Sequence, residues 1–242
     1  MPIMFLGPPL TIIAAIYILA AVLPAFLLLR YIYRQDKVEK EPIGLLLKLL
    51  AMGVLSALCS ILLERIGQRI LHLVAEPGTV TFVLLLAFVV VAMVEEGTKF
   101  YFLRRATWNN PTFNYRFDGS VYAVFVSLGF AAYENIRYVM SYGLSVALPR
   151  AVSAIPGHMS FAVFMGLFYG RARLCHGWGK ERACRRNLRR AYVSAVLLHG
   201  FYDACAMIGT TASMVTFLVF VALMFLTVAR VVRRESERDV PV

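Results

Sequence analysis

Residues 79–105 read TVTFVLLLAFVVVAMVEEGTKFYFLRR, and this stretch decides the fold of the chain. Its first part, residues 80–94, has no charged side chain. The whole stretch is long enough to cross a bilayer as a helix, which takes about 20 apolar residues. Glu95, Glu96 and Lys99 then fall within a single helical turn, and the apolar run resumes at residues 100–103. The charges therefore lie inside the apolar span, where each costs roughly 2.5–3.5 kcal/mol.

The three charges of this span leave one carboxylate without a partner on its own helix. Glu95 and Lys99 are four residues apart with the acid first, which is the favourable order for an ion pair on one helical face. Glu96 then needs a partner from elsewhere in the bundle. We expect Glu64, at the end of the preceding apolar run, to pair with Arg65 or Arg69 at the membrane surface rather than to have a functional role.

The composition is that of a polytopic membrane protein. The chain has 242 residues, of which 60% are hydrophobic and 16% charged, and its mean hydropathy is +0.71. Backbone groups in lipid must be paired internally, which only helices and closed β-barrels achieve. The apolar runs of this chain are continuous and do not alternate as in a membrane β-barrel, so we expect helices. We predict an all-α bundle that forms a single transmembrane domain over residues 1–242. Its seven spans are expected at roughly 9–30, 43–64, 80–104, 119–140, 149–170, 190–209 and 212–230.

The net charge of +11 at pH 7 reflects membrane topology, and we predict no nucleic-acid partner. With the N-terminus outside, nineteen of the 25 lysines and arginines lie in cytoplasmic connections and four lie outside. The positive-inside rule therefore predicts an N-out, C-in orientation. The cytoplasmic side would hold a basic loop at about 171–190 and a disordered basic tail at about 231–242. Such basic segments predict anionic lipids of the bilayer as partners.

Three further spans carry ionisable residues that a purely structural helix does not need. Glu134 lies near the end of span four, His158 lies in span five, and His199 and Asp203 are four residues apart in span six. Each has a structural alternative: Glu134 could pair with Arg137, His158 could join two helices by a hydrogen bond, and His199 could form an inert pair with Asp203. Close packing of span five is predicted by a stripe at every fourth residue, in which His158 lies among the small residues Ala154, Ala162, Gly166 and Gly170.

Five charged groups and two histidines buried in spans three to six must meet one another. Left unpaired, the five charges would cost roughly 12–18 kcal/mol, as much as the stability of a whole domain. We therefore predict one polar site built by these four spans. Paired carboxylates with water and an imidazole can hydrolyse an amide, ligate a metal that activates water, or relay protons in a transporter. A non-catalytic membrane scaffold that binds single-span partners is a further alternative.

Five segments in order carry these residues: EEGTK at 95–99, DGSVY at 118–122, GFAAYEN at 129–135, PGHMSFAVFMG at 156–166 and LHGFYD at 198–203. Together they resemble the PrsW family of intramembrane proteases, within the larger superfamily of CAAX-prenyl-processing proteases, whose patterns include E-E-x-x-K, F-x-x-x-E and H-x-x-x-D. The prenyl-processing relatives usually have a histidine where this chain has Glu134. This difference favours the PrsW branch.

The resemblance implies hydrolysis of peptide bonds in or near the membrane, with a catalytic core at about 80–209. The implied substrates are membrane-anchored regulators such as anti-sigma factors, and the implied location is the cytoplasmic (inner) membrane of a bacterium. Glu95 or Glu96 would activate the water, and His199 and Asp203 would stabilise the oxyanion or hold the water. The pocket would be completed by Glu134 and His158, with support from Lys99, Phe130 and Asn135.

The resemblance leaves the metal dependence of the site open. We expect a glutamate mechanism that requires no cofactor. The alternative is a divalent metal such as zinc, with ligands drawn from Glu95, Glu134, His158 and His199.

Overall fold

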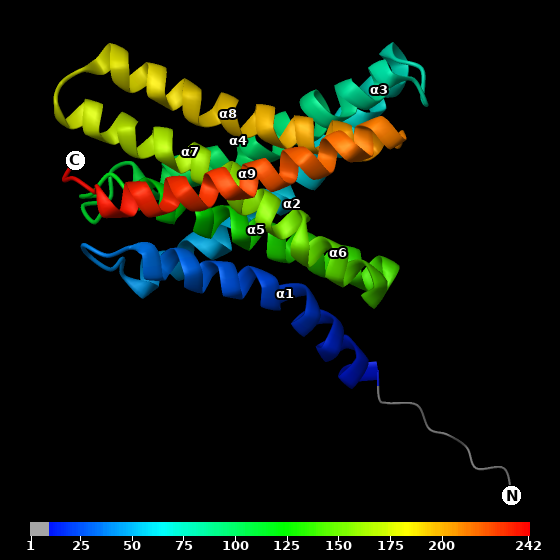
Figure 1. The fold of residues 1–242 in the computed structure, drawn as a ribbon, viewed down its shortest axis with the longest axis horizontal. Helices are drawn as coiled ribbons and strands as arrows, with labels where there is room; N and C mark the ends of the chain where they lie inside the picture. Colours follow the sequence, from blue (N-terminus) through cyan, green and yellow to red (C-terminus); the bar gives the residue numbers. More distant parts are fainter. Residues whose placement is uncertain (1–9) are drawn as a thin grey trace, which may run out of the picture.

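The computed structural model describes residues 10–242, and these residues form the all-α bundle that we predicted (Figure 1). Residue 9, the first of span one, lies outside the described residues. The elements are α1 (Leu10–Gln35), α2 (Ile43–Val74), α3 (Val80–Leu85), the π-helical η1 (Leu86–Ala92), α4 (Met93–Thr107), α5 (Asp118–Tyr142), the 3-10 helix η2 (Leu144–Val146), α6 (Ala147–Val152), α7 (Ala154–Gly177), α8 (Glu181–Ile208) and α9 (Thr211–Glu237).

Six helical stretches of the described residues are long and apolar enough to cross a membrane. They comprise α1, α2, the continuous stretch from α3 to α4, the stretch from η2 to α7, α8 and α9. The seventh predicted span, α5, is too polar to be counted with them. It packs against α1, α2 and α7, and its residues 118–131 are all buried. Because protein rather than lipid surrounds residues 118–131, this part of α5 can carry polar side chains at little cost, whereas Tyr138, Met140 and Tyr142 in its last turns are exposed.

Four segments predicted to be cytoplasmic meet at one end of the bundle. Figure 1 shows the C-terminus beside the turn between α7 and α8. The Asn114 side chain, between α4 and α5, donates to Glu39 Oε2 in the α1–α2 connection (2.9 Å), and the backbone of Asn114 accepts from the N–H of Val242 (2.9 Å). The basic connections therefore share one end, as the charge distribution requires. The N-out, C-in orientation itself stays a prediction.

The basic loop and the basic tail are more ordered than we expected. Most of the predicted loop is helical, since α7 runs to Gly177 and α8 begins at Glu181. The predicted disordered tail is helical to Glu237, and its last residues dock on the α4–α5 connection. Asp239 Oδ1 accepts from the N–H of Phe117 (2.8 Å), and Arg116 donates its N–H to the carbonyl of Val240 (2.9 Å). These contacts explain why the tail prediction was wrong.

Glycines bring the backbone of α5 into contact with a helix on either side. A Cβ atom at Gly166 of α7 would lie 2.4 Å from Ser120 Cα, and one at Gly129 would lie 2.3 Å from the carbonyl oxygen of Leu50 in α2. The predicted close packing of span five is thus confirmed, and α5 is its partner. Helices that touch through backbone atoms have little freedom to slide or rotate, so α5 is held in a defined register.

We expect Gly166→Ala to lower the free energy of unfolding by about 1–3 kcal/mol, because the added methyl group meets the backbone of α5 and forces the helices apart. The measurement is the thermal unfolding midpoint of the purified protein in detergent. Gly44→Ala is the matched control, since a Cβ atom there would meet nothing within 4 Å. Equal midpoints for the two variants would show that the α5–α7 contact is not as tight as described.

Candidate active site

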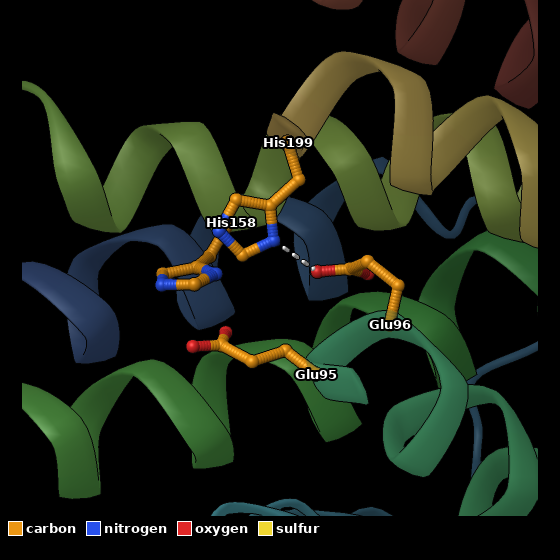
Figure 2. Close-up of side chains that lie close together, drawn as sticks. All are labelled: Glu95, Glu96, His158 and His199. Carbon is orange, nitrogen blue, oxygen red and sulfur yellow. Dashed lines mark hydrogen bonds and ion pairs between the residues drawn. The ribbon is translucent and has the colours of Figure 1, made fainter. Parts of the chain in front are cut away.

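The structure brings the ionisable residues of four helices together in the middle of the bundle. Figure 2 shows the side chains of Glu95, Glu96, His158 and His199 directed into one space. All four residues are buried. The convergence that we predicted from the cost of unpaired charges is therefore present. The contributing residues are Glu95, Glu96 and Lys99 from α4, Glu134 from α5, His158 from α7, and His199 and Asp203 from α8.

A π-helical segment sets the direction of the two adjacent glutamates. The segment η1 ends at Ala92, directly before the turn that carries Glu95 and Glu96, and such segments often occur at functional sites. Side chains from two helices hold this turn. Tyr192 of α8 donates to the carbonyl of Met93 (3.0 Å), and Ser60 of α2 shares a hydrogen bond with Thr98 (2.7 Å). Nothing in the sequence pattern predicted η1.

Lys99 is the cation at the centre of the site. Its Nζ lies 3.2 Å from Glu95 Oε2 and 2.8 Å from Glu96 Oε1, so one ammonium group partners both carboxylates. It also lies 3.2 Å from Nδ1 of His158 and 3.9 Å from the centre of the Phe130 ring. The predicted pair of Glu95 and Lys99 is confirmed, but the expectation that Glu96 lacks a partner on its own helix was wrong, because the same ammonium group reaches both carboxylates. Phe130 supports the site by offering its ring face to the ammonium group.

Two carboxylates flank His199 of α8. Its Nδ1 lies 2.9 Å from Glu96 Oε1, the interaction drawn as a dashed line in Figure 2, and its Nε2 lies 3.4 Å from Asp203 Oδ2. The imidazole ring also stacks on Phe161, with ring centres 4.8 Å apart. His199 and Asp203 touch, as their spacing predicted. This geometry locks the orientation of the imidazole and links it to Glu96 of α4.

The hydrogen bonds of His158 define its tautomer. A lysine ammonium group can only donate, so Nδ1 of His158 accepts from Lys99. Nε2 then carries the proton and donates to Glu134 Oε2 (3.1 Å). Glu134 is also paired with Arg150 Nη2 (2.8 Å). The alternative pair of Glu134 with Arg137 is therefore not the one formed, because Glu134 points into the bundle.

Arg150 and Glu64 are site residues that the sequence pattern did not predict. Arg150 donates through Nε to Oδ1 of Asn135 (2.8 Å), while Nδ2 of Asn135 donates to the carbonyl of Ala21 in α1 (2.8 Å). Asn135 therefore positions Arg150, which in turn holds Glu134. Glu64 lines the same cavity as Glu95, whereas we expected it to pair with an arginine at the membrane surface. Both residues lie at the ends of predicted spans, where the sequence alone gives a charged side chain no distinctive signal.

A cavity of about 470 Å³ gives water access to part of this cluster. It extends to Gln68 of α2, Tyr142 of α5 and Met207 of α8, which lie near the ends of those helices. These ends are opposite the basic connections. Glu96 and Lys99 do not line the cavity and lie behind it. The cluster residues that line it are Glu95, Glu134, His158, His199 and Asp203.

The cluster also fits a divalent metal in residue type and spacing. Glu95, Glu96, His158 and His199 each offer a ligand atom, and these atoms lie within 4.8 Å of one another. Oε2 of Glu96 is buried without a hydrogen-bond partner among the described residues. Both imidazoles contact a carboxylate through the opposite nitrogen, as metal-ligating histidines commonly do. Glu96 thus takes the place that we predicted for Glu134, whose carboxylate lies on the outer side of His158.

Comparisons with known proteins identify the family of the chain. A family described as "PrsW family intramembrane metalloprotease" matches residues 41–229. The chain is 32% identical to "Protease PrsW" of Oceanobacillus iheyensis over 184 residues, 76% of this chain and 80% of that protein. It is 30% identical to "Protease PrsW" of Clostridioides difficile over 86% of each chain. It is also 30% identical to "Protease PrsW" of Bacillus subtilis, over 76% of this chain and 79% of that one. No solved structure matches the chain significantly.

We expect Lys99→Met to lower the free energy of unfolding by about 3–5 kcal/mol, because it leaves two buried carboxylates without their shared cation. The measurement is thermal unfolding in detergent. The matched control is Lys48→Met in α2, where the lysine is exposed. The double variant Glu96→Gln/Lys99→Met should lose less stability than the sum of the two single variants. Additive losses would contradict the central role of this ammonium group.

Proposed function

Because the chain belongs to the PrsW family of intramembrane proteases, we propose that it is an endopeptidase in which Glu95 activates the attacking water. The observation that carries this proposal is a buried carboxylate that faces a water-accessible cavity and lies among two imidazoles. Such a set of groups provides a general base together with hydrogen-bond donors for a developing oxyanion. Family membership favours proteolysis over the alternatives of a transporter or a non-catalytic scaffold.

The cavity distinguishes the roles of the two adjacent glutamates. Glu95 lines the cavity, so a bound water can reach its carboxylate. Glu96 lies behind the cavity, where Lys99 and His199 hold one of its oxygens at 2.8 and 2.9 Å. We therefore assign the base to Glu95 and a positioning role to Glu96.

The hydrolysis proceeds in two proton-balanced steps. Glu95 takes a proton from the water as the water oxygen attacks the scissile carbonyl carbon, and a tetrahedral oxyanion forms. His199 is held by Glu96 through Nδ1 (2.9 Å), and its Nε2, whose contact with Asp203 is longer (3.4 Å), would donate to that oxyanion. The C–N bond then breaks, and Glu95 returns the proton to the leaving amine. Glu134 and His158 complete the wall of the cavity, with Arg150 balancing the charge of Glu134.

The position of the cavity indicates how the substrate approaches. The cavity extends toward the end of the bundle opposite the basic connections, which is the outer face in the predicted N-out orientation. A membrane-anchored protein would then present a peptide bond near the outer surface of its span. We propose single-span regulators of the anti-sigma-factor type as substrates and the inner membrane of a bacterium as the location. The further placement in the superfamily of CAAX-prenyl-processing proteases rests on the motif resemblance.

A metal-dependent form of the same reaction is the second candidate, supported by the donor set around Glu96. A divalent ion held by Glu95, Glu96, His158 and His199 would polarise the carbonyl and lower the pKa of a bound water. The ammonium group of Lys99 already bonds to three of these four residues. A metal held by these residues would have to displace the ammonium group from Nδ1 of His158 and compete with it for Glu95, although Oε2 of Glu96 is without a partner, and we favour the glutamate mechanism on this ground.

Glu95→Gln should lower the rate of cleavage of a co-expressed single-span reporter by at least 100-fold, because a general base contributes about 10²–10⁴-fold. The ion pair of Lys99 with Glu96 remains in this variant, so its thermal midpoint should change little. Glu96→Gln should also abolish cleavage, but with a lowered midpoint, because two buried partners lose their carboxylate. Glu76→Gln, which changes an exposed carboxylate, is the control. Normal cleavage by Glu95→Gln would refute the assignment.

The metal question is tested by elemental analysis of the purified protein together with its activity after chelator treatment. The glutamate mechanism predicts substoichiometric metal and unchanged cleavage after dialysis against a chelator. A bound metal near one per chain, with activity lost on chelation and restored by zinc, would establish the second candidate instead.

A further inference from the structure

A groove on the cytoplasmic half of α8 is unrelated to the catalytic cavity. Its volume is about 700 Å³, and its walls combine arginines with apolar side chains. We call it the arginine groove. It is lined by Arg182, Arg185, Arg186, Arg189 and Arg190, and beyond them by Phe168 of α7 with Val193 and Leu197 of α8.

The groove follows one face of α8. Positions 182, 186, 189, 193 and 197 are three or four residues apart, so their side chains lie above one another along the helix. The charged positions come first and the apolar positions follow. The face therefore changes from strongly basic to apolar along the helix axis.

The arginines of the groove are free to bind an external anion. Among the described residues, the arginines with a carboxylate partner are Arg116, Arg150, Arg171 and Arg233, none of which lines the groove. Glu181, the acid nearest in sequence, is paired with His176 at 3.0 Å. Five guanidinium groups along one helix face thus repel one another without internal compensation, and an anion bound among them would be stabilised.

The length of α8 places the basic half at the membrane surface. A helix of 28 residues is about 42 Å long, whereas the hydrocarbon core of a bilayer is about 30 Å thick. The surplus of about two turns projects from the core, and the basic end of the bundle is the side on which it projects. The arginines then lie at the level of lipid headgroups, while Val193 and Leu197 lie at the level of acyl chains. Both apolar side chains are largely exposed, at 48% and 56%.

We propose that the arginine groove binds one anionic phospholipid of the cytoplasmic leaflet. Its phosphate lies among the arginines, whose planar guanidinium groups bond phosphate oxygens in pairs. One acyl chain lies along Phe168, Val193 and Leu197. This is a defined site on one helix face, beyond the general attraction of basic segments to an anionic surface. The proposal does not depend on the proposed peptidase activity.

The apolar half of the groove distinguishes a lipid from other anionic partners. An acidic protein segment or free phosphate would use only the arginines and would leave the exposed apolar side chains in contact with bulk lipid. A phospholipid matches both halves at once. Its phosphate reaches the arginines in the first half of the groove, and its acyl chain reaches Val193 and Leu197, which follow them along α8. The occupant favoured by the structure is therefore the lipid.

The test is native mass spectrometry of the full-length protein in detergent, titrated with phosphatidylglycerol or phosphatidylcholine. Arg186→Gln/Arg189→Gln should weaken phosphatidylglycerol binding at least about tenfold and leave phosphatidylcholine binding unchanged. Arg230→Gln/Arg234→Gln removes the same charge from exposed positions of α9 and should change the affinity for phosphatidylglycerol less than twofold. Arg186→Lys/Arg189→Lys keeps the topogenic charge and should still weaken binding, because the bidentate contacts are lost.

Three outcomes would overturn the proposal. The first is equal weakening by the α8 and α9 glutamine pairs, which would mean a general charge effect. The second is displacement of the lipid by equimolar glycerol phosphate, which would mean an anion site without an acyl-chain contact. The third is unchanged lipid binding in the α8 variants combined with loss of reporter cleavage, which would assign the groove to the protein substrate.

Discussion

An ammonium group shared by two carboxylates inside an apolar bundle is the interaction on which this structure depends. The pairing of Lys99 with Glu95 and Glu96 offsets the desolvation cost of burying all three charges in one turn of α4. The same ammonium group orients His158 through Nδ1, and Glu96 orients His199. Residues from three helices are thus arranged around one charge. Water reaches this arrangement from one side, so Glu95 is the accessible member of the pair.

The bundle supports this arrangement by enclosing α5. Backbone contacts at Gly129 and Gly166 hold α5 between α2 and α7, which places Glu134 beside His158. Asn135, the next residue, ties α1 and Arg150 to the same point. Residues 118–131 of α5 are surrounded by protein, and Glu134 follows directly after them with its charge paired to Arg150 and its carboxylate in contact with His158. Packing and chemistry are therefore coupled in this helix.

Much of the site was predictable because charges in an apolar span have few ways of being satisfied. Glu95, Glu96, His158, His199 and Asp203 stood out as residues that lipid-facing helices would not carry. Arg150 and Glu64 were not predicted as site residues because they lie near predicted span ends, where a charge needs no special explanation. The docking of the C-terminal tail was not predicted for a related reason. Its contacts are hydrogen bonds to the backbone of a distant connection and the ion pair of Glu235 with Arg116, and such pairings leave no periodic signal in either partner.

The sequence by itself determined that the chain is a helical membrane protein and which residues had to be buried together, because hydropathy and charge are local properties of the chain. The tertiary structure alone decided which partner each charge took. It assigned both glutamates to Lys99 and gave Glu134 to Arg150 instead of Arg137. It also separated the cavity-facing Glu95 from the enclosed Glu96. These choices depend on helix rotation, on the π-helical segment before α4 and on glycine contacts, and each of these is set by packing between segments far apart in the chain.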